Sequence, residues 1–259
     1  MAKRSPLAER LDEVRERIAA AAAKAKRDPK EITLIAVTKS AAPEQVREIL
    51  QLGVGDLGES RVQVLTQRAA QVNEFFQRLQ GKADEAAPSA LPEKLRWHMI
   101  GHLQRNKIKQ ALPYVSLIHS VDSLRLAEEL DTHAAKLERR IPVLLQVNAS
   151  EEPQKFGVAV GAAVHLAEQI DSMPNVQLMG LMSMGPLGDP EKAQGVFART
   201  REIFEEMKWH KIGGTSLRHL SMGMSDDFEQ AIAEGATMVR IGSMLFGGKA
   251  QDHEGLEEG

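Results

Sequence analysis

Segments with the pattern of β-strands alternate with segments that have the pattern of helices along almost the whole chain. Strand patterns fall at residues 32–38, 55–58, 96–100, 115–120, 143–147, 176–182, 217–220 and 238–241. Helical patterns lie between them, near residues 43–52, 60–80, 104–111, 123–138, 160–171, 190–207 and 226–234. Connections of this length let neighbouring strands pair in parallel. About eight β/α units predict an α/β protein with a closed (β/α)8 TIM barrel in preference to an open doubly wound sheet.

Segments outside these units complete the predicted organisation. Residues 6–27 carry apolar side chains at helical spacing and predict an extra N-terminal helix. We expect a single domain over residues 1–248. Within it, residues 81–94 are rich in alanine, proline and acids without periodicity, which predicts a flexible surface insertion. Residues 249–259 are predicted to form a disordered tail.

Composition excludes several classes of protein. The 259 residues carry a net charge of −3 and no block of lysine and arginine with interleaved aromatics, so no nucleic-acid partner is expected. The absence of cysteine excludes disulfides, thiolate metal sites and a cysteine nucleophile. No stretch approaches the ~20 apolar residues of a membrane span. We expect a cytoplasmic protein with no membrane association, and a monomer is the default expectation.

Polar residues gather at the ends of the predicted strands. In a (β/α)8 barrel the carboxyl ends of the strands surround one mouth, where the chemistry of such folds takes place. The polar residues at these ends are Lys39, Glu59, Ser60, His98, His119, Asp122, Asn148, Ser221, Ser225, Arg240 and Ser243. We therefore expect a polar rim around the mouth.

Two glycine-containing loops follow the last two predicted strands. "HLSMGMSDDF" contains Ser221 and Gly223, and "VRIGSMLFGG" contains Gly242 and Ser243. Glycine lets the backbone approach a ligand closely, while hydroxyl groups and the N–H groups that open a helix bind anions. Each loop alone is equally typical of an ordinary turn with a serine cap. Together, at the positions where barrels bind phosphate, they predict a phosphate site.

Lys39 ends the apolar run "LIAVTKS". A lysine whose stem lies among apolar groups has a depressed pKa and supplies the free amine that attacks a carbonyl. The structural alternative is a lysine that reaches solvent or pairs with Glu59. The phosphate site predicted across the same mouth favours the chemical interpretation. A carbonyl at one end and a phosphate at the other describe pyridoxal 5′-phosphate (PLP) or a phosphosugar.

Arg240 precedes the second glycine loop by two residues. This position would let it reach the ring of a cofactor whose phosphate lies on Gly242 and Ser243. An arginine beside a pyridine nitrogen keeps that nitrogen unprotonated, because a guanidinium cannot accept a proton, and this weakens the ring as an electron sink. The alternative of equal weight is a salt bridge to Glu59 or Asp226.

The histidines predict structure more than metal binding. His98 and His102 are four residues apart, but they flank Gly101 without the glutamate of a zincin helix. A hydrogen-bonded structural role is the prediction for both, and equally for His119 and His219. The methionines at strand ends (Met179, Met182, Met184, Met222 and Met224) could line a cofactor pocket, although filling a core is their commoner role.

Several motifs occur in one order along residues 32–247. They are "VTKS", "GESRVQ", "WHMIGHLQRNK", "HSVD", "LLQVNASEEPQKFG", "GLMSMGP" and "LSMGMSDDFEQAIAEGATMVRIGSMLFG". In these motifs the chain resembles the YggS/PROSC family of pyridoxal phosphate homeostasis proteins. The resemblance implies a single-domain barrel of the alanine-racemase type without the second, β-rich domain. It also implies PLP held as a Schiff base, a role in vitamin B6 homeostasis, and little or no catalysis.

The resemblance assigns the cofactor contacts. The Schiff-base lysine corresponds to Lys39, and the arginine that faces the pyridine nitrogen corresponds to Arg240. The phosphate-binding elements correspond to Ser221, Gly223, Gly242 and Ser243. One departure is Ser60, which stands in "GESR" where the family has asparagine. Serine is shorter and offers one donor, so a contact near the cofactor is lost or bridged by water.

Three other functions remain as alternatives. An amino-acid racemase would need a second base; the one tyrosine, Tyr114, precedes a predicted strand and so lies at the wrong end of the barrel. A Schiff-base aldolase-like enzyme acting on a phosphosugar would use Lys39 without a cofactor. An interaction module finds no support in the charge pattern. For a PLP carrier, the expected partners are PLP and PLP-dependent enzymes.

Overall fold

A computed structural model of the chain describes residues 4–80, 91–186 and 188–247. Most of the predicted insertion, residues 81–90, and the whole of the predicted tail, residues 249–259, lie outside the described residues.

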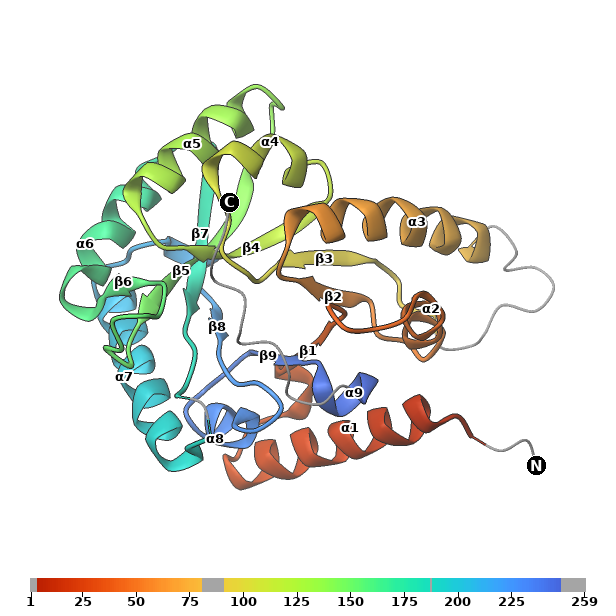
Figure 1. Cartoon of the computed structure of the whole chain (residues 1–259). Helices are drawn as coiled ribbons and strands as arrows, with labels where there is room; N and C mark the ends of the chain where they lie inside the picture. Colours follow the sequence, from red (N-terminus) through yellow and green to blue (C-terminus); the bar gives the residue numbers. More distant parts are fainter. Residues whose placement is uncertain (1–3, 81–90, 187, 248–259) are drawn as a thin grey trace.

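Within the described residues, parallel strands close into an eight-stranded barrel (Figure 1). The strands are β1 (Thr33–Val37), β2 (Asp56–Glu59), β3 (Arg96–Met99), β4 (Val115–Val121), β5 (Ile141–Asn148), β7 (Val176–Met182), β8 (His219–Ser221) and β9 (Met238–Ile241). Each pairs with the next, β5 pairs with β7, and pairing of β1 with β9 closes the ring. A two-residue strand, β6 (Val158–Ala159), pairs with β5. The barrel predicted from the sequence is confirmed.

Helices surround the strands (Figure 1). They are α1 (Pro6–Lys24), α2 (Pro43–Gln51), α3 (Val62–Gln80), α4 (Ile108–Ala111), α5 (Leu124–Ala135), α6 (Val160–Asp171), α7 (Pro190–Trp209), α8 (Phe228–Ala233) and α9 (Ser243–Phe246). Short 3₁₀ turns cover Pro29–Glu31, Arg105–Lys107 and Gly214–Ser216. The sequence pattern missed α9, because four residues are too few to show a helical period.

The extra helix α1 starts where local sequence signals place it. The Ala8 N–H donates to the Ser5 side-chain oxygen at 3.1 Å, and Pro6 occupies the first turn, where its missing N–H costs nothing. The helix packs against α8, α9 and α2 (Figure 1). Because α9 is a single turn, α1 fills the place in the outer ring beside β9 and β1.

Apolar side chains form an outer core and an inner core. The larger, outer core lies between the strands and the surrounding helices. A smaller cluster fills the barrel interior and consists of Ile35, Leu117, Leu144, Met179, Met182 and Met238, with the partly buried Met184 against it. Three of the five methionines singled out in the sequence therefore belong to the inner core, where flexible thioether side chains fill irregular space.

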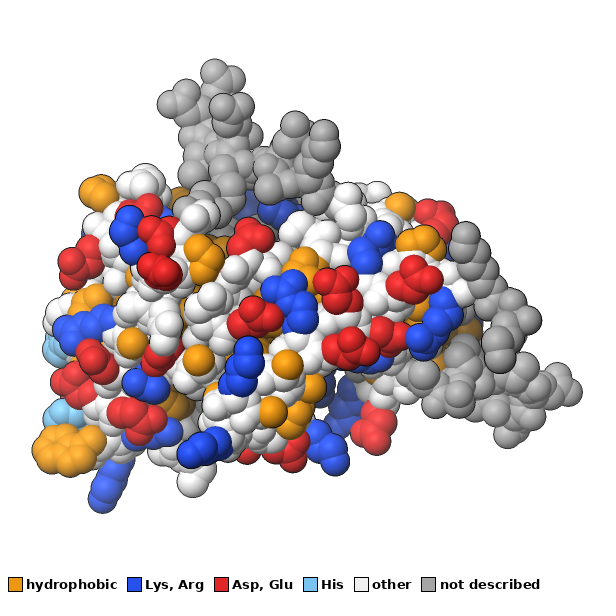
Figure 2. All heavy atoms as spheres, turned by 90° about the horizontal axis from the view of Figure 1, so that it is seen from below, with side chains coloured by type: hydrophobic (Ala, Val, Ile, Leu, Met, Phe, Trp, Pro, Cys, Tyr) orange, Lys and Arg blue, Asp and Glu red, His pale blue; other side chains and the backbone are white. Residues whose placement is uncertain are grey.

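One face of the molecule is mixed in charge. On the face shown in Figure 2, lysine and arginine side chains are interspersed with aspartate and glutamate. This face lacks the single-sign stripe typical of nucleic-acid binding. In residues 4–80, 91–186 and 188–247, no helix is both long and apolar enough to cross a membrane.

We predict that α1 is an integral part of the barrel. Leu11 lies on the buried face of α1 and is 1% exposed. Its replacement by alanine should lower the free energy of unfolding by about 2–5 kcal/mol. Replacement of the exposed Glu13 on the same helix should change it by less than about 0.5 kcal/mol. Urea denaturation of the two variants measures the difference, and equal stabilities would contradict the role given to α1.

Candidate functional site

Closure of the barrel brings Lys39 beside the loop that follows β9. Ala36 of β1 is in register with Ile241 of β9, so the residues after each strand emerge side by side. A Cβ atom at Gly242 would lie 3.2 Å from the carbonyl oxygen of Val37. This close approach of the two chains puts Lys39 and the Gly242–Ser243 turn at the same part of the mouth.

The side chain of Lys39 has a different environment from the one predicted. Lys39 lies two residues beyond the end of β1 and is exposed, so its stem is not packed among apolar groups. The apolar run is buried only as far as Thr38, which is 0% exposed. The ion pair with Glu59 that the sequence offered as an alternative is absent among the described residues, where Glu59 pairs with Arg68 instead.

The two glycine loops meet through a pair of serines. The Ser243 hydroxyl lies 2.9 Å from the Ser225 hydroxyl and donates to it. Gly223, in the first loop, has φ of +88°, and a Cβ there would lie 2.7 Å from both the Cα of Phe228 and the Cβ of Ala231. Glycine is therefore required at 223, both for the left-handed backbone and for the close packing on α8. The loops after β8 and β9 present two hydroxyl groups at one place.

Ser221 does not share this position. Its side chain is fully buried inside the barrel, where the hydroxyl contacts Nδ1 of His119 at 2.9 Å and accepts from Nη1 of Arg240 at 2.6 Å. In this structure the Ser221 hydroxyl is engaged by His119 and Arg240, and its contact with a phosphate stays a prediction. Ser225, four residues later in "SMGMS", is the hydroxyl that reaches the second loop.

Arg240 is a buried cation held by neutral acceptors. It is 4% exposed and donates to the carbonyl oxygens of Ser221 at 2.8 Å and Ser183 at 3.0 Å, besides the Ser221 hydroxyl. Within the described part of the chain it forms no ion pair, so the predicted alternative of a bridge to Glu59 or Asp226 is not found. Burial lowers the pKa of Arg240 to about 10, although the negative charge of Asp227 raises it in part. The side chain therefore remains protonated at neutral pH.

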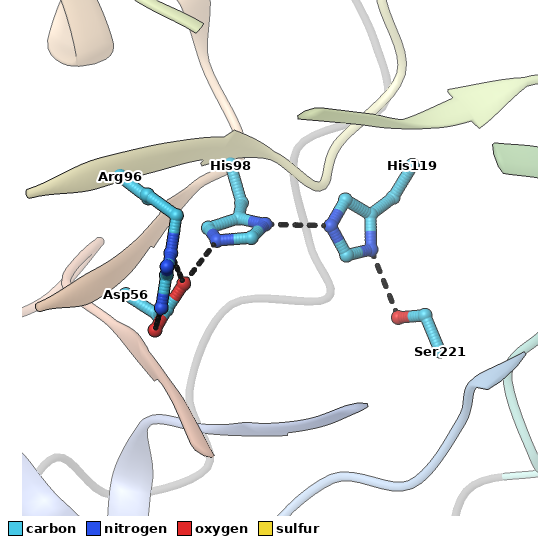
Figure 3. A network of polar contacts seen from close by, with 5 residues as sticks. All are labelled: Asp56, Arg96, His98, His119 and Ser221. Atoms are coloured by element: carbon cyan, nitrogen blue, oxygen red, sulfur yellow. Dashed lines mark hydrogen bonds and ion pairs between the residues drawn. The ribbon is translucent and has the colours of Figure 1, made fainter. Parts of the chain in front are cut away.

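A chain of polar contacts crosses the barrel interior from Ser221 (Figure 3). His119 Nε2 lies 2.9 Å from His98 Nδ1, and His98 Nε2 lies 2.9 Å from Asp56 Oδ1. Arg96 then binds both oxygens of Asp56, each at 2.6 Å. The structural roles predicted for His98 and His119 are confirmed. Asp56 and Arg96 were missed, because each is the first residue of its strand, at the end away from the mouth.

The charge states along this chain follow from burial and from the neighbours. Burial raises the pKa of Asp56, but hydrogen bonds from Arg96 and His98 outweigh it and lower that pKa to about 2. Burial, with the nearby His98 and Arg240, lowers the pKa of His119 well below its ordinary value. At neutral pH, Asp56 is therefore a carboxylate and His119 a neutral imidazole. Burial next to Arg218 also lowers the pKa of His219, to about 4.

Glu59 holds the end of β1 from outside the barrel. Its carboxylate is 1% exposed, accepts from the Thr38 hydroxyl at 2.5 Å and lies 3.4 Å from Nε of Arg68 on α3. Arg68 also donates to the Thr38 carbonyl oxygen at 2.5 Å. This cluster fixes the backbone immediately before Lys39. Burial raises the pKa of Glu59, and its Oε2 has no hydrogen-bond partner among the described residues.

Ser60 and His102 lie at the rim. Ser60 is half-buried, and a Cβ atom at Gly101 would lie only 2.2 Å from its carbonyl oxygen, so the turn after β3 packs directly on it. His102 lies 3.4 Å from Asp122 and stacks on Phe156 with ring centroids 4.2 Å apart. His102 therefore points away from His98. Across the described ranges, no cluster of three or more His, Cys, Asp or Glu residues could hold a metal ion.

The fold and this set of residues define a barrel of the alanine-racemase class. The family described as "Alanine racemase, N-terminal domain" matches residues 4–250. Among curated proteins, the chain is 39% identical to the pyridoxal phosphate homeostasis protein of Aquifex aeolicus, over 92% of this chain and 96% of that one. Its counterpart in Pseudomonas aeruginosa is 38% identical, over 95% and 96%.

A solved structure extends the similarity to three dimensions. PipY of Synechococcus elongatus, solved with PLP bound, is 34% identical and superposes with a TM-score of 0.73, over 93% of this chain and 99% of that chain. The chain therefore belongs to the family of pyridoxal phosphate homeostasis proteins.

We predict a pH-dependent effect of Glu59→Gln. Because the pKa of Glu59 is raised in the folded protein above its ordinary 4.5, folding favours the protonated form, and the wild type loses stability as the carboxyl ionises. Glutamine stays neutral and still accepts from Thr38, so the variant should gain stability relative to wild type as pH rises from about 4 to about 7. Urea denaturation at several pH values measures this difference.

The control is Glu44→Gln, which changes an exposed glutamate on α2. Its stability should follow that of wild type at every pH. A Glu59→Gln variant that loses stability relative to wild type as pH rises would show that ionised Glu59 is favoured by Arg68 more than it is opposed by burial.

Proposed function

We propose that the protein binds PLP and functions in vitamin B6 homeostasis, holding the cofactor as a Schiff base on Lys39 with little or no catalysis. The observation that carries the proposal is the convergence of an exposed lysine with two hydroxyl-bearing glycine turns at one part of the barrel mouth. The names of the curated relatives and the PLP-bound PipY structure support the same cofactor.

The phosphate end of the cofactor fits the two loops. Ser225 and Ser243 offer hydroxyl groups 2.9 Å apart, and the turns that carry them contain Gly223 and Gly242. A side chain at Gly223 would fill space now occupied by α8, and one at Gly242 would press on Val37. Both turns therefore bring bare backbone close to the place where the hydroxyls meet, which suits a tetrahedral anion.

The carbonyl end fits Lys39. When bound, PLP supplies an aldehyde carbon and an electron-withdrawing ring. The unprotonated amine of Lys39 adds to that carbon, a C=N bond forms, and the carbonyl oxygen leaves as water. The exposed position of Lys39 lets the cofactor arrive and depart directly from solvent. The cluster of Thr38, Glu59 and Arg68 fixes the backbone from which Lys39 extends.

The ring end fits Arg240, because its hydrogen bonds within the barrel use only part of its guanidinium. Three bonds to Ser221 and Ser183 leave at least two of its five N–H groups without a partner in the described residues. An arginine at the ring nitrogen keeps that nitrogen unprotonated and limits the electron sink that racemisation requires. Tyr114, just before β4, lies at the opposite end of the barrel from the mouth.

The remaining features of the proposal concern organisation. Residues 1–248 would form one domain that acts as a monomer in the cytoplasm, with residues 81–94 as an insertion and residues 249–259 as a tail. Ser60 would approach the cofactor through fewer hydrogen bonds than an asparagine. PLP-dependent enzymes would exchange the cofactor with the protein. The mixed charge on the face shown in Figure 2 supports partners other than nucleic acid.

We predict that Lys39 is the attachment point. Wild-type protein incubated with PLP should develop a visible absorption band, and borohydride reduction followed by peptide mapping should locate the modification on Lys39. Lys39→Ala should abolish both signals. Lys107→Ala, which removes a lysine from the 3₁₀ turn between β3 and α4, should retain them. A colourless, unmodified wild type would reject the cofactor and favour a Schiff-base enzyme acting on a phosphosugar.

We predict that Ser225 and Ser243 recognise the phosphate. The double replacement by alanine should weaken PLP binding by about ten-fold or more, the equivalent of one hydrogen bond to a charged group. Binding of pyridoxal, which lacks the phosphate, should be unchanged. Absorbance titrations with both ligands measure this. Equal weakening for the two ligands would show that the serines act on the aldehyde or ring end instead.

A further inference from the structure

The polar chain inside the barrel has acceptors at one end and donors at the other. Asp56 is a carboxylate and can only accept hydrogen bonds, whereas Arg240 is a guanidinium and can only donate them. Between them stand two histidines and a serine, linked by contacts of 2.9 Å (Figure 3). The two ends therefore decide where every proton between them lies.

The protons can be placed in order from Asp56. Its carboxylate requires a hydrogen on Nε2 of His98, so neutral His98 presents a bare Nδ1 to His119. His119 must then carry its hydrogen on Nε2, which leaves its Nδ1 as an acceptor. The Ser221 hydroxyl donates to that nitrogen and turns its lone pairs toward Arg240. Each donor in this arrangement meets one acceptor.

The opposite order leaves a conflict beside Arg240. If His119 carried its hydrogen on Nδ1, both that N–H and the Nη1–H of Arg240 would point at the same Ser221 oxygen. The serine's own proton would then need another acceptor in a fully buried site, where an unsatisfied polar group is destabilising. The same conflict arises if His98 is doubly protonated, because it would then donate to Nε2 of His119.

We propose that Asp56, His98 and His119 are positioning residues that act through Ser221 to hold Arg240 in place for the cofactor ring. This inference rests on the proposed function, in which Arg240 contacts the ring of PLP. We call the hydrogen-bonded chain Asp56–His98–His119–Ser221 the relay. Because the relay keeps a lone pair of the Ser221 hydroxyl directed at Arg240, the guanidinium keeps one orientation without a carboxylate in contact. Asp56 acts from the far end of β2, anchored there by the half-exposed Arg96.

The first test measures the proton positions directly, without the cofactor. In protein labelled with ¹⁵N-histidine, long-range ¹H–¹⁵N correlation spectra distinguish the two tautomers of each imidazole. His98 and His119, assigned by substitution, should both carry their hydrogen on Nε2 at neutral pH. A hydrogen on Nδ1 of His119, or a doubly protonated His98, would overturn the proposal. Because wild-type protein is used, the result does not depend on whether a variant folds.

The second test measures the effect on PLP. His119→Leu removes the hydrogen bonds to both His98 and Ser221, whereas the amide oxygen of the asparagine in His119→Asn can still accept from Ser221. We expect His119→Leu to weaken PLP binding about ten-fold and to move the visible absorption maximum, and His119→Asn to restore both largely. The control is His219→Gln, which replaces the histidine of β8 and has no side-chain contact with Ser221 among the described residues; it should match wild type.

The two tests separate the proposals. A wild type that fails to bind PLP would reject the proposed function, while the tautomers would still report on the relay. A wild type that binds PLP, with a His119→Leu variant of equal affinity and spectrum, would reject the positioning role alone. If His119→Leu unfolds, seen as loss of its circular dichroism signal, the proposal is tested by the histidine tautomers of the wild type and by His119→Asn. The visible absorption spectrum of PLP bound to His119→Asn should match that of wild type.

Discussion

The pairing of β1 with β9 is the constraint on which the site depends. Lys39 and Ser243 are separated by most of the chain, and only closure of the ring places the ends of these two strands next to each other. The approach is tight, since a Cβ atom at Gly242 would lie only 3.2 Å from the carbonyl oxygen of Val37. The helix α1 covers the outside of this junction and packs on α8 and α9. The geometry of the mouth therefore depends on the same strand pairing that closes the barrel.

The barrel could be predicted because its signal is repeated. Each strand is a short apolar run followed by a helical pattern, and a misplaced boundary at one strand does not change the number of β/α units. β7 and β9 were predicted with the bounds that the structure has, while β8 begins two residues later than its pattern indicated. Leu217 and Arg218 look like strand residues in the sequence, but they follow a 3₁₀ turn at Gly214–Ser216 and join the sheet only from His219 onward. Tertiary pairing, which a local pattern does not contain, set that boundary.

The candidate site was predictable in its positions and less so in its side-chain contacts. Strand ends and glycine turns place Lys39, Gly223, Gly242 and Ser243 at the mouth without any knowledge of contacts. The inward or outward direction of a side chain at a strand end is harder, because one residue of shift reverses it. Ser221 is the last residue of β8 and points into the barrel, whereas Ser225 lies on the loop. Lys39 falls beyond the strand, where burial ends.

The polar chain from Asp56 to Ser221 shows why the joint role that we propose for several residues carries no sequence signal. Asp56, His98 and His119 are distant in sequence and lie in no common motif, and each is ordinary by itself. Their importance arises from the buried charge of Arg240, which needs acceptors in a place that apolar residues would otherwise fill. A carboxylate in contact would satisfy that charge but would also compete with a ligand for the same N–H groups. Neutral acceptors ordered by a distant carboxylate satisfy Arg240 and leave its remaining N–H groups without a carboxylate in contact, which gives a physical reason for a polar chain that crosses the barrel interior.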